Sequence, residues 1–571
     1  MHHVEIFLLV AGAVLVAAAC RRRGWPAPLV IVAIALVVSF VPGVPRYEID
    51  SELLLEFVLP PLLYSAALSS SYRDFRASLN SITRLGVGLV LVSAVAVALV
   101  FWASERAVPF AAALVLGAVV APPDAVAAAA VGRRLGLPRR VMTLLSGESL
   151  INDATSLTLY KVALVGVATG TWLLGDAIRT FSLAVVVGVG VGLVLGWVVH
   201  QIRLHLDDPV VASAIGLLTP FAAYWFAEAV SGSGVLAVVT AGLYLGHTSP
   251  RAGYATRLYE EPIWSTLDIL LESFTFALIG VQLPWVIRDV IASDQGLGHG
   301  IAVSLLVLLT AILVRPAYIF VTSRFDHLRL RGSHRPERDS LTARESAVVS
   351  WAGMRGVVTL AAAAAIPVTL GGAPFPERAT IQLAAYTVAL GTLLAQGLTL
   401  PWVIRRLGVG SDDEAARDAA QEAATRVATA EAVQQALEAR RDAWAALVGP
   451  EQADETVRRL STAWRARAAA AAVMLDPEHA DELLPDDLDA SESARGLGPL
   501  AAPREDGSLP GAEESRRAQK LRRQIVAVQR EVLMQRRDAG ELDEAVMRRM
   551  MRELDLEDES LSSSWLERVP G

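Results

Sequence analysis

The sequence predicts an all-α polytopic membrane protein with about 13 transmembrane helices, followed by a helical cytoplasmic tail. Hydrophobic residues make up 53% of the 571 positions, a larger share than in ordinary soluble domains. The chain contains thirteen apolar stretches that are long enough to cross a hydrocarbon core of about 30 Å. Arginine is concentrated in every second connecting segment, as expected when the chain crosses a membrane repeatedly.

The thirteen predicted spans follow one another from the N-terminus to about residue 406. They lie near 4–20, 28–42, 52–68, 86–103, 108–131, 141–167, 180–199, 209–230, 234–247, 263–283, 299–322, 342–368 and 380–404. The first stretch has no basic residues before it and is followed by Arg21–Arg23. This order favours a retained first helix over a cleaved signal peptide.

The connecting segments predict the orientation of the chain. The arginine-rich segments begin with Arg21–Arg23 and end with Arg405 and Arg406, whereas the intervening segments contain few arginines. Because positively charged loops stay in the cytoplasm, we expect the N-terminus outside and the tail inside. The predicted location is a plasma (inner) membrane of bacterial type.

Charge separates two predicted regions, a transmembrane domain over 1–406 and a cytoplasmic tail over 407–571. The tail contains 34 acidic and 22 basic residues, a net charge of −12, whereas the body has a net charge of +4. Nothing in this balance indicates a nucleic-acid surface. Cys20 is the only cysteine, which excludes an intrachain disulfide. No cofactor is expected.

The tail has helix-length polar patterns near 411–447, 451–474 and 514–553. Between the last two, an acidic stretch with Pro and Gly over 477–511 is typical of a linker. Two interpretations remain open. These helices are either solvated and help the chain to dimerise, or they form a regulatory domain that gates transport.

The thirteen spans divide into a first group of six, one linking span and a second group of six. This division predicts two inverted-topology repeats. The first span enters from outside and the eighth from inside, as such repeats require. The fifth span is interrupted at Pro122 and Pro123, and the twelfth at Gly353-Met354-Arg355-Gly356. Paired interruptions at matching positions of two halves indicate a binding site near the membrane midplane.

Carboxylates lie next to these interruptions. Asp124 follows the two prolines directly, and the sixth span carries Ser149, Asn152 and Asp153 at spacings that bring them toward one face of a helix. Asp153 would supply charge and the other two would supply neutral oxygens, a ligand set that suits Na⁺. Unwound carbonyls near Pro122 and Pro123 are expected to complete the shell.

Other charged residues in the apolar spans have less direct interpretations. Arg315 needs an acid partner because an unpaired guanidinium is costly in hydrocarbon, and Glu148 is the expected partner. The pair is expected to hold the architecture, and a role in ion transport is the alternative. Arg355 is expected to face two half-helix ends. Asp268 and Glu272 are four residues apart and fit an interface or a water-filled lumen equally well.

A buried carboxylate in this setting predicts ion or proton transport. If it holds either a cation or a proton but not both, exchange follows directly, because burial makes a carboxylate keep its proton more tightly. Helix-packing polar groups, a cation channel and a non-transporting sensor are the alternatives. An enzyme is not expected, because the chain lacks a His-Glu-x-x-His motif and Ser149 has no evident activating partner.

Several motifs together resemble the monovalent cation:proton antiporter family, in its NhaP and Na⁺/H⁺ exchanger branch, over roughly 1–406. They are Gly147-Glu148-Ser149-Leu150-Ile151-Asn152-Asp153, Ala121-Pro122-Pro123-Asp124-Ala125-Val126, Trp351-Ala352-Gly353-Met354-Arg355-Gly356, Phe276–Gln282 and Leu59-Pro60-Pro61-Leu62-Leu63. The Glu-Ser-x-x-Asn-Asp string is the most specific of them. Where the family commonly has Thr-Asp-Pro in the fifth span, this chain has Pro123-Asp124-Ala125, so a hydroxyl ligand is missing.

The resemblance implies a thirteen-helix homodimer in which a core domain (spans 4–6 and 11–13) moves against a dimer domain (spans 1–3 and 8–10). Asp153 would bind the cation or the proton, assisted by Asp124, Asn152 and Ser149, and would hold Na⁺ with low affinity together with Asp124. Asn-Asp in the motif implies electroneutral exchange. The expected substrates are H⁺ with Na⁺, and K⁺ or Li⁺ remain alternatives.

Overall fold

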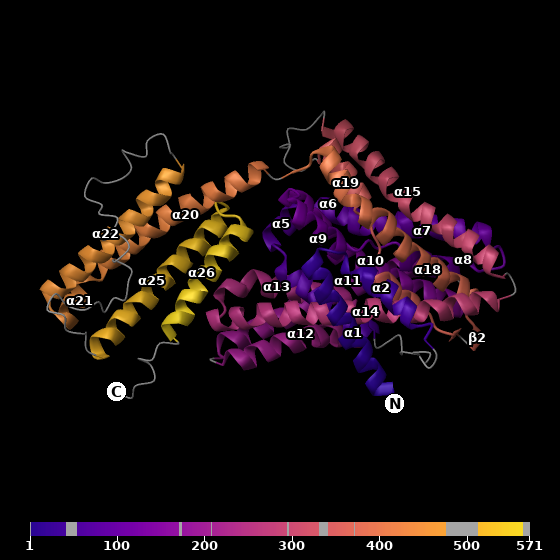
Figure 1. Ribbon diagram of the computed structural model, residues 1–571, viewed down its shortest axis with the longest axis horizontal. Coiled ribbons are helices and arrows are strands. Elements are labelled where there is room, and N and C mark those ends of the chain that lie inside the picture. The colour runs from indigo at the N-terminus through magenta and orange to yellow at the C-terminus, as the bar shows by residue number, and fades with distance from the viewer. Residues whose placement is uncertain are drawn as a thin grey trace. The chain divides into compact units, whose positions relative to one another are not determined.

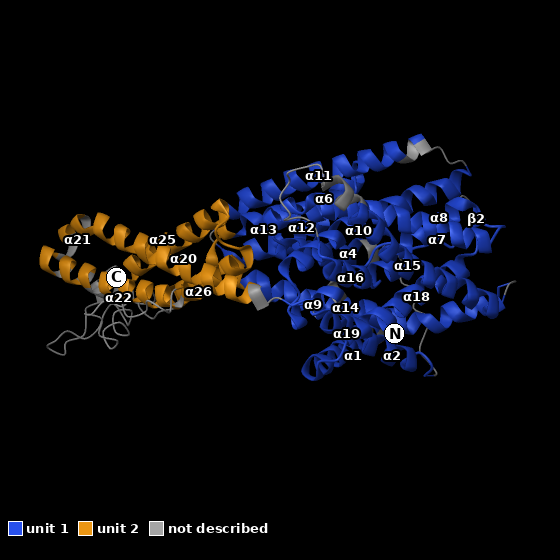
Figure 2. Ribbon diagram, turned by 90° about the horizontal axis from the view of Figure 1, so that it is seen from above, with its two compact units in different colours: residues 1–249, 259–411 blue, residues 250–258, 412–571 orange. Residues whose placement is uncertain are grey.

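In the computed structural model, two compact units make up the chain (Figure 2). One consists of residues 1–249 and 259–411, and the other of residues 250–258 and 412–571. The structure describes residues 2–41, 54–170, 174–206, 208–293, 296–330, 341–370, 372–410, 412–475 and 512–562. The linker predicted over 477–511 lies outside these residues.

The first unit is helical, so the predicted all-α membrane fold is confirmed. Its first helices are α1 (His2–Arg23), α2 (Ala27–Val38), η1 (Leu54–Val58), α4 (Leu59–Ser69), α5 (Tyr72–Ala77), α6 (Leu79–Thr83), η2 (Arg84–Leu89), α7 (Val90–Ser104), α8 (Phe110–Val120), α9 (Ala125–Leu135) and α10 (Arg139–Thr169). Then follow α11 (Leu174–Leu204), α12 (Pro209–Ala229), α13 (Gly234–Thr248), η3 (Ser249–Arg251), which falls largely in the second unit, α14 (Tyr254–Ile291), which begins in the second unit, α15 (Gly296–Leu330), α16 (Ala343–Trp351), α17 (Val357–Ala364), α18 (Arg378–Thr392), η5 (Leu393–Gly397) and α19 (Leu398–Leu407). Among the described residues, the only strands are the antiparallel pair β1 (Thr369–Leu370) and β2 (Ala373–Pro374).

Helix occupies most of every predicted span. Within the described residues, six helical segments are long and apolar enough by themselves to cross a membrane, and α2 and α8 are shorter apolar helices. Two other spans fall short of that length because the chain divides them. The fifth is split into α8 and α9, and the twelfth into α16 and α17.

Local sequence explains both divisions. Pro122 and Pro123 lack backbone N–H groups, and a proline also disfavours helical backbone in the residue before it. The second break contains two glycines. The two breaks meet, because the backbone N–H of Asp124 donates to the carbonyl of Met354 at 2.6 Å.

Helices of the first unit pack in two groups. In one group α15 contacts α7 and α18, α8 contacts α7 and α10, and these helices lie side by side in Figure 1. In the other group α13 contacts α4, α11 and α12. Glycine permits a close approach of α13 to α4, since a Cβ atom at Gly246 would lie 2.5 Å from the carbonyl oxygen of Leu68.

The second unit is a helical bundle with its own apolar core. Its helices are α20 (Asp412–Ala439), α21 (Arg441–Val448), α22 (Pro450–Leu475), α25 (Ala512–Ala539) and α26 (Glu544–Ser562). Helix α20 packs against α22 and α25, and α25 against α26. The segment 250–258 belongs to this unit, where the guanidinium of Arg257 donates to the carboxylate of Asp555.

Candidate cation site at the helix breaks

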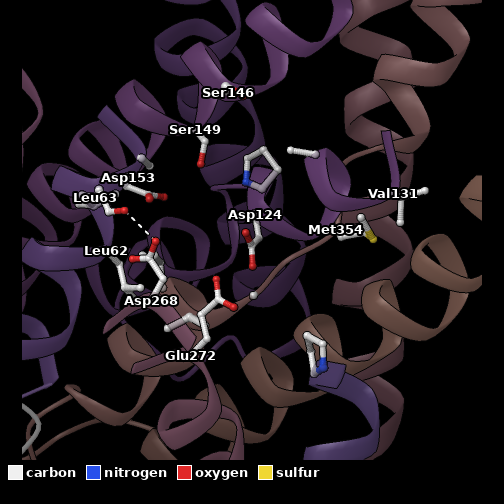
Figure 3. Close-up of a pocket in the computed structure, with 18 of the residues that line it drawn as sticks. Leu62, Leu63, Asp124, Val131, Ser146, Ser149, Asp153, Asp268, Glu272 and Met354 are labelled. Carbon is white, nitrogen blue, oxygen red and sulfur yellow. Dashed lines mark hydrogen bonds between the residues drawn. The ribbon is translucent and has the colours of Figure 1, made fainter. Parts of the chain in front are cut away.

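A cavity of about 840 Å³ lies at the two helix breaks. Its lining includes the carboxylates of Asp124 and Asp153, the hydroxyl of Ser149, and both prolines of the first break. Figure 3 shows the labelled acidic side chains and Ser149 around one space. Arg21 and Arg133, which belong to segments predicted to be cytoplasmic, also line the cavity.

Helix α10 carries the central residues of the site. Ser149 and Asp153 are one turn apart and both line the cavity, although Asp153 is only 4% exposed. Asn152 is fully buried and has a different position, since its Nδ2 donates to the carbonyl of Pro123 at 2.9 Å. Asn152 therefore holds α10 against the first break, and the Pro123 carbonyl is already engaged by this amide.

Asp124 occupies the crossing point of the two breaks. It immediately precedes α9, and its carboxylate lies against Gly356, the residue that precedes α17. A Cβ atom at position 356 would lie 1.7 Å from Oδ2 of Asp124, so only glycine fits there. Helix N-termini carry partial positive charge, and both of these half-helices therefore stabilise an anionic Asp124.

Arg355 compensates the opposite helix ends. Its fully buried guanidinium donates to the carbonyls of Val120 (Nε, 3.1 Å), Gly353 and Ala311 (Nη2, 3.3 Å). Val120 is the last residue of α8, and Gly353 follows the end of α16, so the cation satisfies carbonyls that the breaks leave without helical partners. At the crossing, the anionic Asp124 therefore lies at the N-termini of two half-helices, and the cationic Arg355 lies at the C-termini of the other two.

Glu148 and Arg315 form a separate buried pair outside the cavity lining. The Nη1 and Nη2 atoms of Arg315 donate to the two carboxylate oxygens of Glu148. The distance from Nη2 to Oε2 is 2.7 Å. Nε of the same guanidinium donates to the carbonyl of Val349 at 2.9 Å. The pair therefore joins α10, α15 and α16, and both side chains are only 1% exposed.

The structure also places acids on the opposite wall of the cavity. Asp268 and Glu272 of α14 line it, and Asp268 accepts a hydrogen bond from the hydroxyl of Ser65 at 2.7 Å (Figure 3). The sequence showed the helical spacing of the two acids but gave no sign of which helix faces them. Ser65 and Thr359, which also line the cavity, were not among the expected site residues.

A family model described as "Sodium/hydrogen exchanger, transmembrane" matches residues 8–406. The chain belongs to this family. A relative in Mycobacterium tuberculosis, named as an uncharacterised Na⁺/H⁺ exchanger, is 36% identical over 406 residues, which are 70% of this chain and 74% of the relative. The Na⁺/H⁺ antiporter ApNhaP of Aphanothece halophytica is 30% identical over 420 residues, 72% of this chain and 76% of that protein.

The fold is similar to that of a solved sodium proton antiporter. The structure of the sodium proton antiporter MjNhaP1 from Methanocaldococcus jannaschii at pH 8 matches with a TM-score of 0.58 at 20% identity. The match covers 71% of this chain and 97% of that structure. At this identity the match shows the fold alone, which agrees with the predicted fold class. The predicted family is confirmed, and the protein is a multi-pass membrane protein.

Proposed function

We propose that this exchanger-family chain is a secondary-active Na⁺/H⁺ antiporter that binds Na⁺ and H⁺ in competition at Asp153. The observation that carries the proposal is the shared cavity of Asp153 and Asp124 beside two touching helix breaks. Its oxygen donors, with the hydroxyl of Ser149, are of the kind that hard monovalent cations prefer. The names of the relatives agree with this substrate pair.

Competition follows from electrostatics. Asp153 and Asp124 are close enough for their negative charges to repel each other. A proton on Asp153 removes the negative charge that attracts Na⁺ and occupies an oxygen that would coordinate it. One bound species must therefore leave before the other binds. A single ionisable carboxylate on this turn of α10, with neutral Asn152 beside it, supports electroneutral exchange of one cation for one proton.

Alternating access completes the proposed cycle. With the N-terminus outside and the tail inside, the end of the cavity near Arg21 and Arg133 opens to the cytoplasm. About two turns beyond Asp153, Lys161 of α10 forms an ion pair with Glu228 of α12 that links the two helix groups. We propose that the core group, with Asp153, moves against the other group within a homodimer in the plasma membrane.

The test uses proteoliposomes with an imposed pH gradient and a fluorescent pH indicator. Addition of Na⁺ should release protons from the wild-type vesicles, and Asp153→Asn should abolish this response. Glu261→Gln, which removes an exposed acid of α14, serves as the control and should retain it. Full activity of Asp153→Asn would refute the site, and a rate that follows an imposed membrane potential would refute electroneutrality.

Broader monovalent cation/H⁺ exchange is the second candidate. A relative in Bacillus subtilis named "Sodium, potassium, lithium and rubidium/H(+) antiporter" is 28% identical over 389 residues, 66% of this chain and 57% of that protein. A hydroxyl ligand is missing at Pro123, and this loss bears on the selectivity between monovalent cations. Replacing Na⁺ by K⁺, Li⁺ or Rb⁺ in the same vesicles decides between the two candidates.

A further inference from the structure

We propose that Asp268 and Glu272 form a second cation-binding station, on the cavity wall that faces Asp153. The cation would occupy this station on its way between the cavity mouth and Asp153. The proposal rests on the proposed function, because it gives the transported cation a second place to bind. It assigns a role in uptake to residues of α14 that the exchange mechanism itself does not use.

Both acids share a cavity with the proposed exchange site. Asp268 and Glu272 are one helical turn apart and line the same cavity as Asp124 and Asp153 (Figure 3). Oδ2 of Asp268 accepts the hydrogen bond from Ser65, while its Oδ1 is buried and has no hydrogen-bond partner among the described residues. A buried carboxylate oxygen without a donor is costly, and a cation would satisfy it.

A neutral oxygen in the same cavity points to a ligand independently of the acids. Thr359 lines the cavity and is only 1% exposed, and its hydroxyl oxygen has no hydrogen-bond partner in the described part of the chain. It lies on α17, whose Ala361 belongs to the same small buried cluster as Leu278 of α14. Hydroxyl and carboxylate oxygens together are the ligands that a hard monovalent cation accepts.

Electrostatics explains why a station is useful here. Glu272 is close enough to Asp124 and Asp268 for their negative charges to repel, and Arg133 and Arg21 partly offset this charge. The two arginines line the cavity and would repel an entering cation. The acids on the facing wall counter this positive charge and make the electrostatic potential around them negative. A focused negative potential raises the local cation concentration.

Charge removal at the facing wall tests the proposal by separating KM from the maximal rate. Glu272→Gln and Asp268→Asn preserve shape, and the asparagine can still accept the Ser65 hydrogen bond. We expect each variant to raise the KM for Na⁺ about three- to tenfold and to leave the maximal rate within about twofold. The control Glu261→Gln removes an exposed charge from the same helix and should leave KM unchanged.

If Asp268 and Glu272 only stabilised the structure, their variants would affect KM and the maximal rate differently. An unchanged KM in both variants, or a loss of maximal rate without a change in KM, would overturn the station. Direct binding of ²²Na⁺ to purified protein separates this outcome from failure of the exchange proposal. Asp153→Asn should retain weak ²²Na⁺ binding, and adding Glu272→Gln should remove it. Equal binding by the single and double variants would refute the station even if wild-type vesicles show no exchange.

Discussion

The buried pair of Glu148 and Arg315 gives the sharpest stability prediction. Arg315→Met removes a guanidinium that makes three hydrogen bonds, two to Glu148 and one to the carbonyl of Val349. Glu148 then remains as a buried charge without its partner. Removing one member of a buried pair costs about 3–5 kcal/mol. At about 2 °C per kcal/mol, the melting temperature of the purified protein should fall by about 6–10 °C.

Two further variants make this prediction specific. Arg344→Met removes an exposed guanidinium from α16 and should shift the melting temperature by no more than about 1 °C. The double variant Glu148→Met with Arg315→Met replaces the pair by apolar side chains and should recover most of the loss. The reasoning is refuted if Arg315→Met melts within about 2 °C of the wild type, or if the double variant is as unstable as the single one.

Three other predictions concern the crossing and the second unit. Gly356→Ala should abolish exchange because its Cβ displaces the carboxylate of Asp124, whereas Gly298→Ala, with open space around it, should be silent; equal activities would contradict this. Arg355→Lys keeps the charge but not the fork that caps two half-helices, so the melting temperature should drop by about 2–6 °C, and an unchanged value would argue against capping. Asp555→Asn removes the negative charge that two arginines of the second unit share, and trypsin should then cleave α26 faster than in the wild type.

Sequence patterns predicted the fold well because they reflect local and one-dimensional constraints. The length of apolar stretches determines which segments cross a bilayer, and a proline pair and two glycines mark where the fifth and twelfth spans are interrupted. The family and the helical membrane fold follow from these patterns. The domain boundary at 407 and the roles of the site residues remain predictions. The number of spans is a further prediction, with helix present in each of the thirteen segments.

Contacts between distant segments were harder to predict. The spacing of Asp268 and Glu272 showed that they share a helix face, but the sequence could not tell that this face lines the cavity of Asp153. Similarly, Asn152 was expected among the cation ligands, and in the structure its amide holds the Pro123 carbonyl. Such pairings depend on how helices pack against one another, which periodicity within a single helix does not encode.

The central claim is that Na⁺ and H⁺ exclude each other at Asp153. It is tested most directly by titrating Na⁺ into the purified, weakly buffered protein while following the release of protons. We predict that the wild type releases about one proton for each Na⁺ bound at mildly acidic pH, and that Asp153→Asn releases none. Binding of Na⁺ by the wild type without proton release at any pH would contradict the account.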